Sequence, residues 1–476
     1  MEKSKRKNSD VTSAKLTETL VDELVDISFN PCVKDAIELA VRSVLSDGTF
    51  PKHHRWEILK LLPDQSGEDW LEKTKARNTK KTFKISLPYE LLEELDTACR
   101  MKYPYLRTMS EQIEYCIITM IVEHQTAKLG RPIRLPGSKW GEMKNVSQTV
   151  LDGRKYKKVV EPCVGALGIF CNIDCADEIF LNDYDTGKYC FYRELQTKPV
   201  RLLNKLLSEQ PSIEKCKCYK KILREIDPSY IKKKPSERDY SNADIADMFF
   251  YENYYSKDRR AKGEVPLYVK PTLEYICSIL KDAERLRGIM VENPETINCP
   301  RQVRLTNKDL LELIPMKNDK DTLIICDPPY PYTGAYQENL TIDQHRQLAY
   351  LLKKHKGDFI YFCRLTERKD NEIFASTRVH AFITDMFASD EKNVTSFFLD
   401  IDTRDGMERV ITNFNFDGAT PYTFETDAIK RKADVKKEKE SEEKKEAEKK
   451  KAGAQKEEDA EENSSSDEKG GDSDEK

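Results

Sequence analysis

The chain has 476 residues, of which 34% are charged and 38% hydrophobic, and its formal net charge is −4. No apolar run approaches the roughly 20 residues of a membrane span, which excludes a transmembrane protein. No signal-peptide segment follows the charged start, so we expect an intracellular protein with room for two or three domains.

The thirteen cysteines are scattered, without the spacings of a compact secreted disulfide framework. Cys171 with Cys175, and Cys216 with Cys218, are the two pairs closest to a metal-binding pattern. Neither pair has the CxxC spacing of zinc sites, so we expect no metal.

The first region, about residues 16–77, is predicted to be helical. Leu20, Leu24 and Ile27 recur at helical spacing, and a similar apolar pattern returns over residues 36–44. The region contains no recognisable chemical motif. We expect it to be a packing domain of unknown role.

Residues 80–123 differ, because they begin with strict alternation of apolar and polar residues. The alternation predicts a strand, and Pro88 then opens a helix at a favoured first-turn position. Thr108 and Glu111 have the spacing of a capping box and predict the start of a second helix. The residues on the polar face of the strand are Thr82, Lys84 and Ser86.

Strand, helix, helix in this order resembles the ribbon-helix-helix DNA-binding fold. In that family two chains pair their strands into a ribbon that enters the major groove. The resemblance implies that Thr82, Lys84 and Ser86 face DNA and that residues 80–123 form a homodimer. An ordinary helical hairpin with an edge strand is the alternative.

A linker with Gly130, Pro132 and Pro136 separates this segment from the main domain. Four apolar runs, 159–162, 178–183, 322–327 and 358–362, predict short buried strands. Helical stretches between them indicate an α/β fold with a mostly parallel sheet. The predicted domains are 1–77, 78–127, 132–424 and a charged tail, 427–476. The tail has almost no apolar residues and is expected to be disordered.

The most informative motif is Asp327-Pro328-Pro329-Tyr330, which follows the predicted strand 322–326. It places an acid, two prolines and an aromatic ring at the carboxyl edge of a sheet, where open α/β folds bind ligands. The prolines lack N–H donors, so the edge offers mainly acceptors beside the flat face of Tyr330. This arrangement suits an exocyclic amine on a planar ring. An acidic turn after a strand is the alternative.

Four further motifs precede this tetrad in the chain: 137–139 (Gly-Ser-Lys), 161–168 (Glu-Pro-Cys-Val-Gly-Ala-Leu-Gly), 182–183 (Asn-Asp) and 307–310 (Asn-Lys-Asp-Leu). A strand, a glycine-containing turn and an acid at the end of the next strand form the general layout of a nucleoside site. The turn lacks the G-x-G-x-x-G spacing and a Walker lysine, which disfavours a dinucleotide or triphosphate.

Together, in this order, the motifs resemble the Dam-type DNA adenine methyltransferases over about residues 134–416, which implies a Rossmann-like sheet. The residues that would contact S-adenosylmethionine are Lys139, Pro162, Cys163, Gly165, Asp183, Asp309 and Leu310. The residues that would hold the target amine and base are Asp327, Pro328, Pro329 and Tyr330. Leu167 stands where the family usually has a second glycine, which puts residues 166–168 in doubt as ligand contacts.

In this family the insertion over residues 198–301 is where the target is recognised. It is rich in lysine, arginine and tyrosine, which suits a surface facing DNA. The most suggestive residues are Arg259, Arg260 and Lys262. This stretch departs from the family's pattern, so no recognition sequence can be carried over.

The resemblance implies a site-specific DNA adenine methyltransferase in the cytoplasm or nucleoid of a bacterial or phage-like system. A catalytically decayed methyltransferase fold that serves as a DNA-binding regulator is the alternative, and Leu167 is its one supporting feature. Methylation of RNA or of a cytosine amine shares the chemistry. The biological role, whether in restriction, regulation or a mobile element, stays open.

Overall fold

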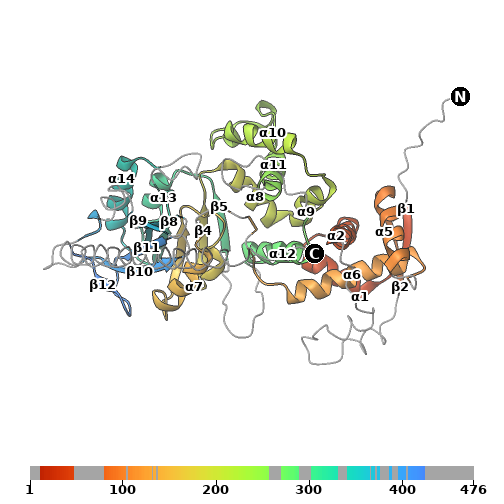
Figure 1. Ribbon diagram of the computed structural model, residues 1–476, viewed down its shortest axis with the longest axis horizontal. Helices are drawn as coiled ribbons and strands as arrows, with labels where there is room; N and C mark the ends of the chain where they lie inside the picture. The colour runs from red at the N-terminus through yellow and green to blue at the C-terminus, as the bar shows by residue number, and fades with distance from the viewer. Residues whose placement is uncertain are drawn as a thin grey trace, which may run out of the picture. The chain divides into compact units, whose positions relative to one another are not determined.

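The structure is a computed structural model that describes residues 11–47, 80–102, 106–130, 132–133, 135, 138–256, 270–288, 302–330, 340–364, 366–369, 372–375, 385–388, 395–403 and 406–423. The chain divides into two compact units, residues 1–362 and 363–476. Figure 1 labels the helices and strands and colours them in chain order. No helix within the described ranges is long and apolar enough to cross a bilayer. Within the same ranges, no three His, Cys, Asp or Glu side chains gather as a metal ion would require.

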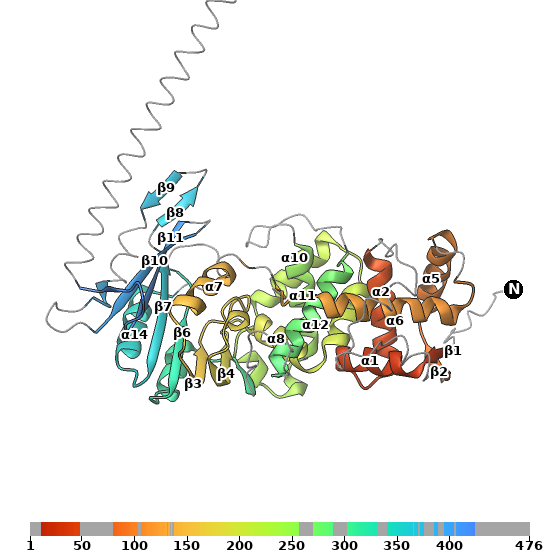
Figure 2. The same cartoon turned by 90° about the horizontal axis from the view of Figure 1, so that it is seen from below.

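The N-terminal region contains the order strand, helix, helix twice (Figure 2). The first set is β1 (Val11–Thr17), α1 (Glu18–Ser28) and α2 (Val33–Asp47), and the second is β2 (Lys80–Ser86), α5 (Tyr89–Lys102) and α6 (Met109–Thr126). The two helices predicted from the apolar spacing of the first region are confirmed. The first helix begins at Glu18, close to the expected start near residue 16, and the strand before it was not predicted; its Ala14 and Leu16 are fully buried while Lys15 is exposed. The rest of the predicted helical region, residues 48–77, lies outside the described residues.

The strand predicted in 80–123 is confirmed as β2, and Thr108 and Glu111 form the predicted capping box at α6. β2 pairs antiparallel with β1, with Ala14 opposite Phe83 and Lys15 opposite Thr82. The ribbon-helix-helix resemblance had implied pairing between two chains. Here the partner strand comes from the same chain.

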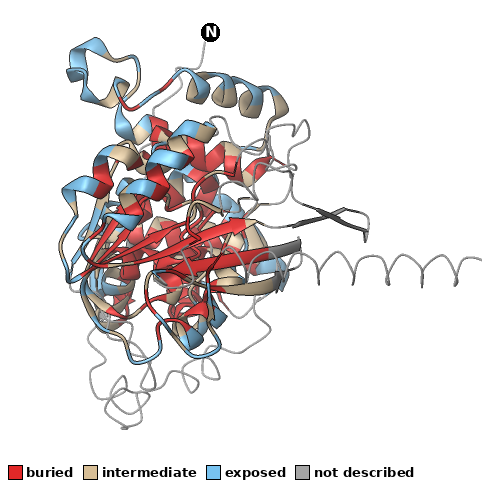
Figure 3. Ribbon diagram, turned by 90° about the vertical axis from the view of Figure 1, so that its left-hand side faces the viewer, coloured by how far each residue is buried: buried red, intermediate tan, exposed pale blue. Residues whose placement is uncertain are grey.

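Five parallel strands form the main sheet of the first unit in the order β7-β6-β3-β4-β5. They are β3 (Tyr156–Glu161), β4 (Ala176–Asn182), β5 (Gln302–Thr306), β6 (Thr322–Cys326) and β7 (Asp358–Arg364). The four predicted strands are confirmed, and β5 was not predicted. All five residues of β6 are buried, as its apolar sequence requires. Figure 3 shows most of the sheet in the colour of buried residues. Because the strands are parallel, their carboxyl ends meet at one edge.

Helices flank this sheet, as the predicted crossover connections require. They are α7 (Trp140–Thr149), α8 (Thr186–Thr197), α13 (Leu310–Met316) and α14 (Ile342–Lys353). The Asp185 side chain caps α8 by accepting a 3.1 Å hydrogen bond from the Lys188 N–H. This cap fixes where the chain turns from β4 into α8, directly beside Asp183.

The described part of the insertion is helical. It consists of α9 (Pro199–Ser208), α10 (Ile213–Arg224), α11 (Asn242–Tyr255) and α12 (Leu273–Arg287), with single-turn helices at Tyr230–Lys232 and Pro235–Glu237. The N-terminal region packs on it, α2 against α9 and α6 against α12. His124 Nε2 lies 2.9 Å from Glu284 Oε1, and the Ser46 hydroxyl donates to the Pro271 carbonyl at 2.6 Å. These contacts join the repeated strand-helix-helix region to the insertion.

The second unit contains β8 (Thr366–Lys369) paired with β9 (Glu372–Ala375), and β10 (Phe397–Thr403) paired with β11 (Gly406–Thr412) and with β12 (Thr420–Pro421). Arg409 is buried and its Nε donates to Asp400 at 2.8 Å across the β10–β11 pair. The charged tail lies outside the described residues.

Candidate active site

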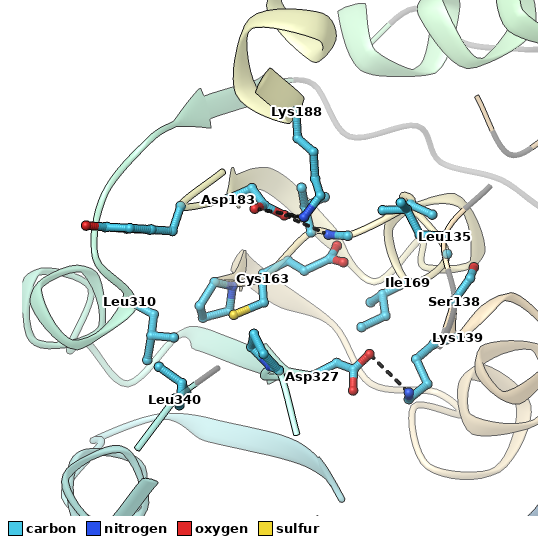
Figure 4. A pocket seen from close by; sticks show the side chains of 18 of the residues that line it. Leu135, Ser138, Lys139, Cys163, Ile169, Asp183, Lys188, Leu310, Asp327 and Leu340 are labelled. Atoms are coloured by element: carbon cyan, nitrogen blue, oxygen red, sulfur yellow. Dashed lines mark hydrogen bonds and ion pairs between the residues drawn. The ribbon is translucent and has the colours of Figure 1, made fainter. Parts of the chain in front are cut away.

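A cavity of about 390 Å³ opens at the carboxyl edge of the main sheet (Figure 4). Glu161 ends β3, Asp183 follows β4, and Asp327 follows β6, so three acids from three strands line one space. The sequence-predicted residues in its walls are Lys139, Pro162, Cys163, Gly165, Asp183, Asp309, Leu310, Asp327 and Pro329. The structure thus brings together all seven residues predicted to bind a cofactor and two of the four in the Asp-Pro-Pro-Tyr tetrad.

Asp327 is held by two side chains. Lys139 Nζ lies 3.1 Å from its Oδ2, and the Tyr330 hydroxyl donates to its Oδ1 at 3.0 Å. Lys139 is only 3% exposed, so this ion pair is almost fully shielded from water on its cationic side. The carboxylate of the tetrad is therefore fixed in direction before any ligand binds.

Tyr330 is 4% exposed and does not line the cavity wall. The Lys139 ammonium lies 5.2 Å from the centre of its ring and 5.8 Å from the centre of the Phe362 ring. The aromatic residue of the tetrad therefore contacts both Asp327 and Lys139. A planar ligand that stacks on it would have to move this cation.

The turn after β3 approaches the site closely. Gly165 has φ +50°, a left-handed conformation that favours glycine, and the Tyr192 hydroxyl donates to its carbonyl at 2.6 Å. Leu167 also has positive φ, at +62°, but its side chain is fully buried and does not line the cavity. Ala166 and Gly168 do line it. The leucine at position 167 therefore does not remove its two neighbours from the cavity wall.

Gly168 sets the distance between this turn and the Gly-Ser-Lys segment. A Cβ at this position would lie 2.9 Å from the Ser138 Oγ and 2.9 Å from the Trp140 backbone nitrogen. Only glycine permits so close an approach. This contact explains how Lys139, distant in sequence, reaches the end of β6. Gly137 lies outside the described residues.

Asp183 is nearly buried and firmly oriented. It accepts hydrogen bonds from the N–H groups of Gly165 and Asp185, each at 3.0 Å, and its Oδ1 lies 3.3 Å from Lys188 Nζ. Burial raises the pKa of the Asp183 carboxyl, and the Lys188 ammonium opposes the shift. Lys188 was not predicted from sequence; its place in the first turn of the helix after Asp183 is the signal that could have found it.

Glu161 was quoted within the turn motif but given no role of its own. Its side chain is fully buried in the cavity wall, and neither carboxylate oxygen has a hydrogen-bond partner. Burial, followed by the charges of Asp327 and Asp183, raises its pKa well above the ordinary value. Such a group is poised to receive a donor or a cation from a ligand.

Cys163 is held as a thiol. Its hydrogen bond with Cys326 and its burial raise its pKa well above the ordinary value. Cys163 lines the cavity, and a thiol with a raised pKa is a weak nucleophile, so we expect it to contact a ligand without forming a bond to it.

Asp309 caps helix α13, accepting a 2.8 Å hydrogen bond from the Leu311 N–H. The Asn182 amide links this loop to the turn after β3, because it donates to the carbonyls of Pro162 and Lys308, each at 2.9 Å. Asn182 belonged to a quoted motif, but the pattern gave no indication of this bridging role.

Of the residues predicted to contact DNA, the three on β2 are not part of the cavity wall. Thr82 and Lys84 are exposed and Ser86 is half-buried, all on β2. Arg259, Arg260 and Lys262 lie outside the described residues. In the described insertion, Lys215 is paired with Glu209 at 2.7 Å and lies over the rings of Tyr219 and Tyr251. The positive charge of Lys215 therefore interacts with groups of the protein itself.

Comparison with known families finds one match. The model of the D12 class N6 adenine-specific DNA methyltransferases matches residues 136–382, which is just over half of the chain. The matched range begins just before Ser138 and contains every residue of the cavity wall named above. No curated protein matches the chain.

Proposed function

The chain belongs to the D12 class of N6 adenine-specific DNA methyltransferases, and we propose that it acts at specific sites of duplex DNA. It would transfer a methyl group from S-adenosylmethionine to the exocyclic amine of an adenine extruded from the helix. The observation that carries the proposal is the cavity itself, in which the oriented carboxylate of Asp327 shares one space with Glu161 and Asp183.

The cavity residues fit the cofactor by size and by chemistry. About 390 Å³ lies within the range of small-molecule sites, roughly 300–1,000 Å³. Asp183 offers carboxylate acceptors for ribose hydroxyls, and Leu310 offers an apolar surface for a purine ring. The unpartnered oxygens of Glu161 suit the cationic part of the molecule. When bound, S-adenosylmethionine supplies an electrophilic methyl group on a sulfonium.

The protein's contribution is to orient the amine. The exocyclic nitrogen of adenine is a poor nucleophile, because its lone pair is delocalised into the ring. Asp327 and the carbonyl of Pro328 would accept hydrogen bonds from its two N–H groups and direct the lone pair out of the ring plane. Positioning of this kind, with a fixed carboxylate near the developing positive charge, lowers the barrier without a strong base.

The adenine must leave the base stack to reach Asp327, which costs a few kcal/mol. Tyr330 would provide a stacking face for the extruded base, and Pro329 would fix the backbone between the two. Because the ammonium of Lys139 lies over the Tyr330 ring, entry of the base would displace Lys139 from the ring while leaving it near Asp327.

The regulator alternative rested on Leu167. Its side chain is buried and outside the cavity wall, so this residue removes no acceptor or donor from the site. Methylation of another nucleobase is set aside by the adenine-specific class to which the chain belongs. The cellular location stays a prediction.

The test is expression in a host that lacks adenine methylation, followed by sequencing of its DNA for methylated adenine. The wild type should methylate adenines within one recurring sequence. Asp327→Ala should abolish this while still binding S-adenosylmethionine. Asp152→Ala, which removes an exposed carboxylate from the turn before β3, is the matched control and should methylate normally. Equal methylation by Asp327→Ala and the control would overturn the proposal.

A further inference from the structure

The two strand-helix-helix sets of the N-terminal region are arranged reciprocally. β1 pairs with β2 along seven residues each, and the pairing is antiparallel. The second helix of each set packs against both helices of the other, since α6 contacts α1 and α2, and α2 contacts α5 and α6. One chain thus supplies both halves of a paired unit.

The ribbon has one buried face and one exposed face. Ala14, Leu16 and Ile85 are at most 1% exposed and face the helices. Lys15 lies opposite Thr82, and all three of Lys15, Thr82 and Lys84 are exposed. The backbone register pairs Ser13 with Lys84 and Val11 with Ser86.

The exposed side chains that the structure describes on this outer face are Lys15, Thr82 and Lys84, two lysines and a hydroxyl with no acid among them. Lys81, on the other face, is paired with Glu18 at 2.9 Å. Lys15 and Lys84 therefore place two positive charges on the outer face of the ribbon.

The outer edge of β1 is closed to another strand. The N–H of Lys15 donates to the Ser110 hydroxyl at 3.0 Å, and the N–H of Thr17 donates to Glu114 at 3.3 Å. The Thr17 hydroxyl also donates to Glu114. Backbone groups that would otherwise pair with a further strand are thus satisfied by α6. The ribbon is complete with two strands.

We propose that β1 and β2 form a DNA-binding ribbon made by a single chain, with Lys15 and Lys84 on the groove-facing side. A two-stranded ribbon fits the major groove of B-DNA, and hydroxyl and ammonium groups can contact base edges and phosphates there. The protein then binds DNA as a monomer. The proposal does not depend on the methyl-transfer chemistry.

The helices that support the ribbon contact the insertion. His124 and Ser46, from the second helices of the two sets, contact Glu284 and Pro271 of the insertion. The helices that pack beneath the ribbon are therefore attached to the insertion by direct contacts as well as by the chain. The ribbon would add affinity for the duplex DNA on which the enzyme acts.

The first experiment measures binding of the full chain to a labelled duplex of about 30 base pairs at several salt concentrations. Lys15→Ala/Lys84→Ala should weaken binding about tenfold and lower the salt slope by about 2, one unit per lost phosphate contact. The control is Lys320→Ala/Lys356→Ala, which removes two exposed lysines at the opposite, amino edge of the main sheet. Equal affinity in the two double variants would overturn the proposal.

Duplex RNA of the same sequence tests whether the ribbon enters the major groove and whether it prefers DNA. Its major groove is too deep and narrow for a ribbon, so the ribbon variant should bind RNA as the wild type does. An equal loss of affinity for RNA and DNA would contradict groove entry. Unchanged binding of S-adenosylmethionine shows that each variant is folded, and a wild type that binds DNA but does not methylate would contradict the proposed function alone.

The single-chain arrangement is tested by cross-linking amines in an equal mixture of ¹⁴N- and ¹⁵N-labelled protein. Links between Lys15 and Lys84 should join peptides of the same label only. Links that join peptides of different labels would show strands exchanged between two chains and would overturn the monomeric ribbon.

Discussion

Lys139 and Asp327 form an ion pair in which Nζ lies 3.1 Å from Oδ2. The two residues are 188 positions apart in the sequence. Lys139 is brought there by the close contact of Gly168 with Ser138 and Trp140. The pair joins the Gly-Ser-Lys segment, the turn after β3 and the end of β6 into one site.

Removal of the cation should affect catalysis more than binding. Lys139→Gln would leave Asp327 without its partner ammonium, and we expect kcat to fall by about 10- to 100-fold. In a double-mutant cycle, Lys139→Gln should add little to the loss caused by Asp327→Asn, because the two residues act together. Additive losses would show that Lys139 acts independently of Asp327.

Gly168→Ala should weaken cofactor binding. The added Cβ would lie 2.9 Å from the Trp140 backbone nitrogen, which cannot rotate away, so the turn and the Lys139 segment must separate. We expect affinity for S-adenosylmethionine, measured by calorimetry, to fall by at least about tenfold, or 1.4 kcal/mol. Gly141→Ala is the control, because a Cβ there meets nothing within 4 Å and lies in helix α7. That variant should bind normally and be slightly more stable.

Glu161 should make stability depend on pH. Its folded pKa is raised by burial above the ordinary 4.5, so the folded state holds a proton that the unfolded state has lost. Between 4.5 and the folded pKa, stability therefore falls as the pH rises. Glu161→Gln removes this effect, and its thermal midpoint should exceed that of the wild type by more at pH 8 than at pH 5. Glu225→Gln, an exposed glutamate, should show no such trend. A difference that shrinks with rising pH would contradict the raised pKa.

Substitution of Glu161 should change thermal stability and cofactor affinity in opposite directions. Glu161→Gln should be more stable near neutral pH and yet bind S-adenosylmethionine less tightly, because an amide cannot carry the negative charge that a bound cation favours. The two measurements are made on one preparation. Tighter binding by Glu161→Gln would show that the glutamate does not face the cationic part of the cofactor.

The main sheet could be predicted from sequence because its strands are short, apolar and bounded by polar motifs. β6, with Thr-Leu-Ile-Ile-Cys, is the clearest case. The roles of the site residues were implied by the resemblance to the Dam-type methyltransferases. Most of these residues follow a strand end, and parallel strands bring those ends together, but Lys139 follows no strand. β5 was not predicted, because Gln302, Arg304 and Thr306 interrupt its apolar pattern. None of its five residues is fully buried.

The N-terminal strand could not be predicted in the same way. Val11–Thr17 contains Thr, Ser and Lys, so its sequence has no clear apolar pattern. It forms a strand by pairing with β2, which follows more than 60 residues later. Pairing over such a distance leaves no local signal. The role of Glu161 was hidden for a related reason, since a carboxyl becomes unusual only when the folded chain buries it without a partner.

The most direct test of the site is Asp327→Asn in purified protein, which keeps the shape of the side chain and removes its charge. Formation of N6-methyladenine in duplex DNA should fall by about 100-fold or more, while the affinity for S-adenosylmethionine stays within about twofold of the wild type. An Asp327→Asn enzyme that methylates adenine at the wild-type rate would contradict the assignment of this cavity as the active site.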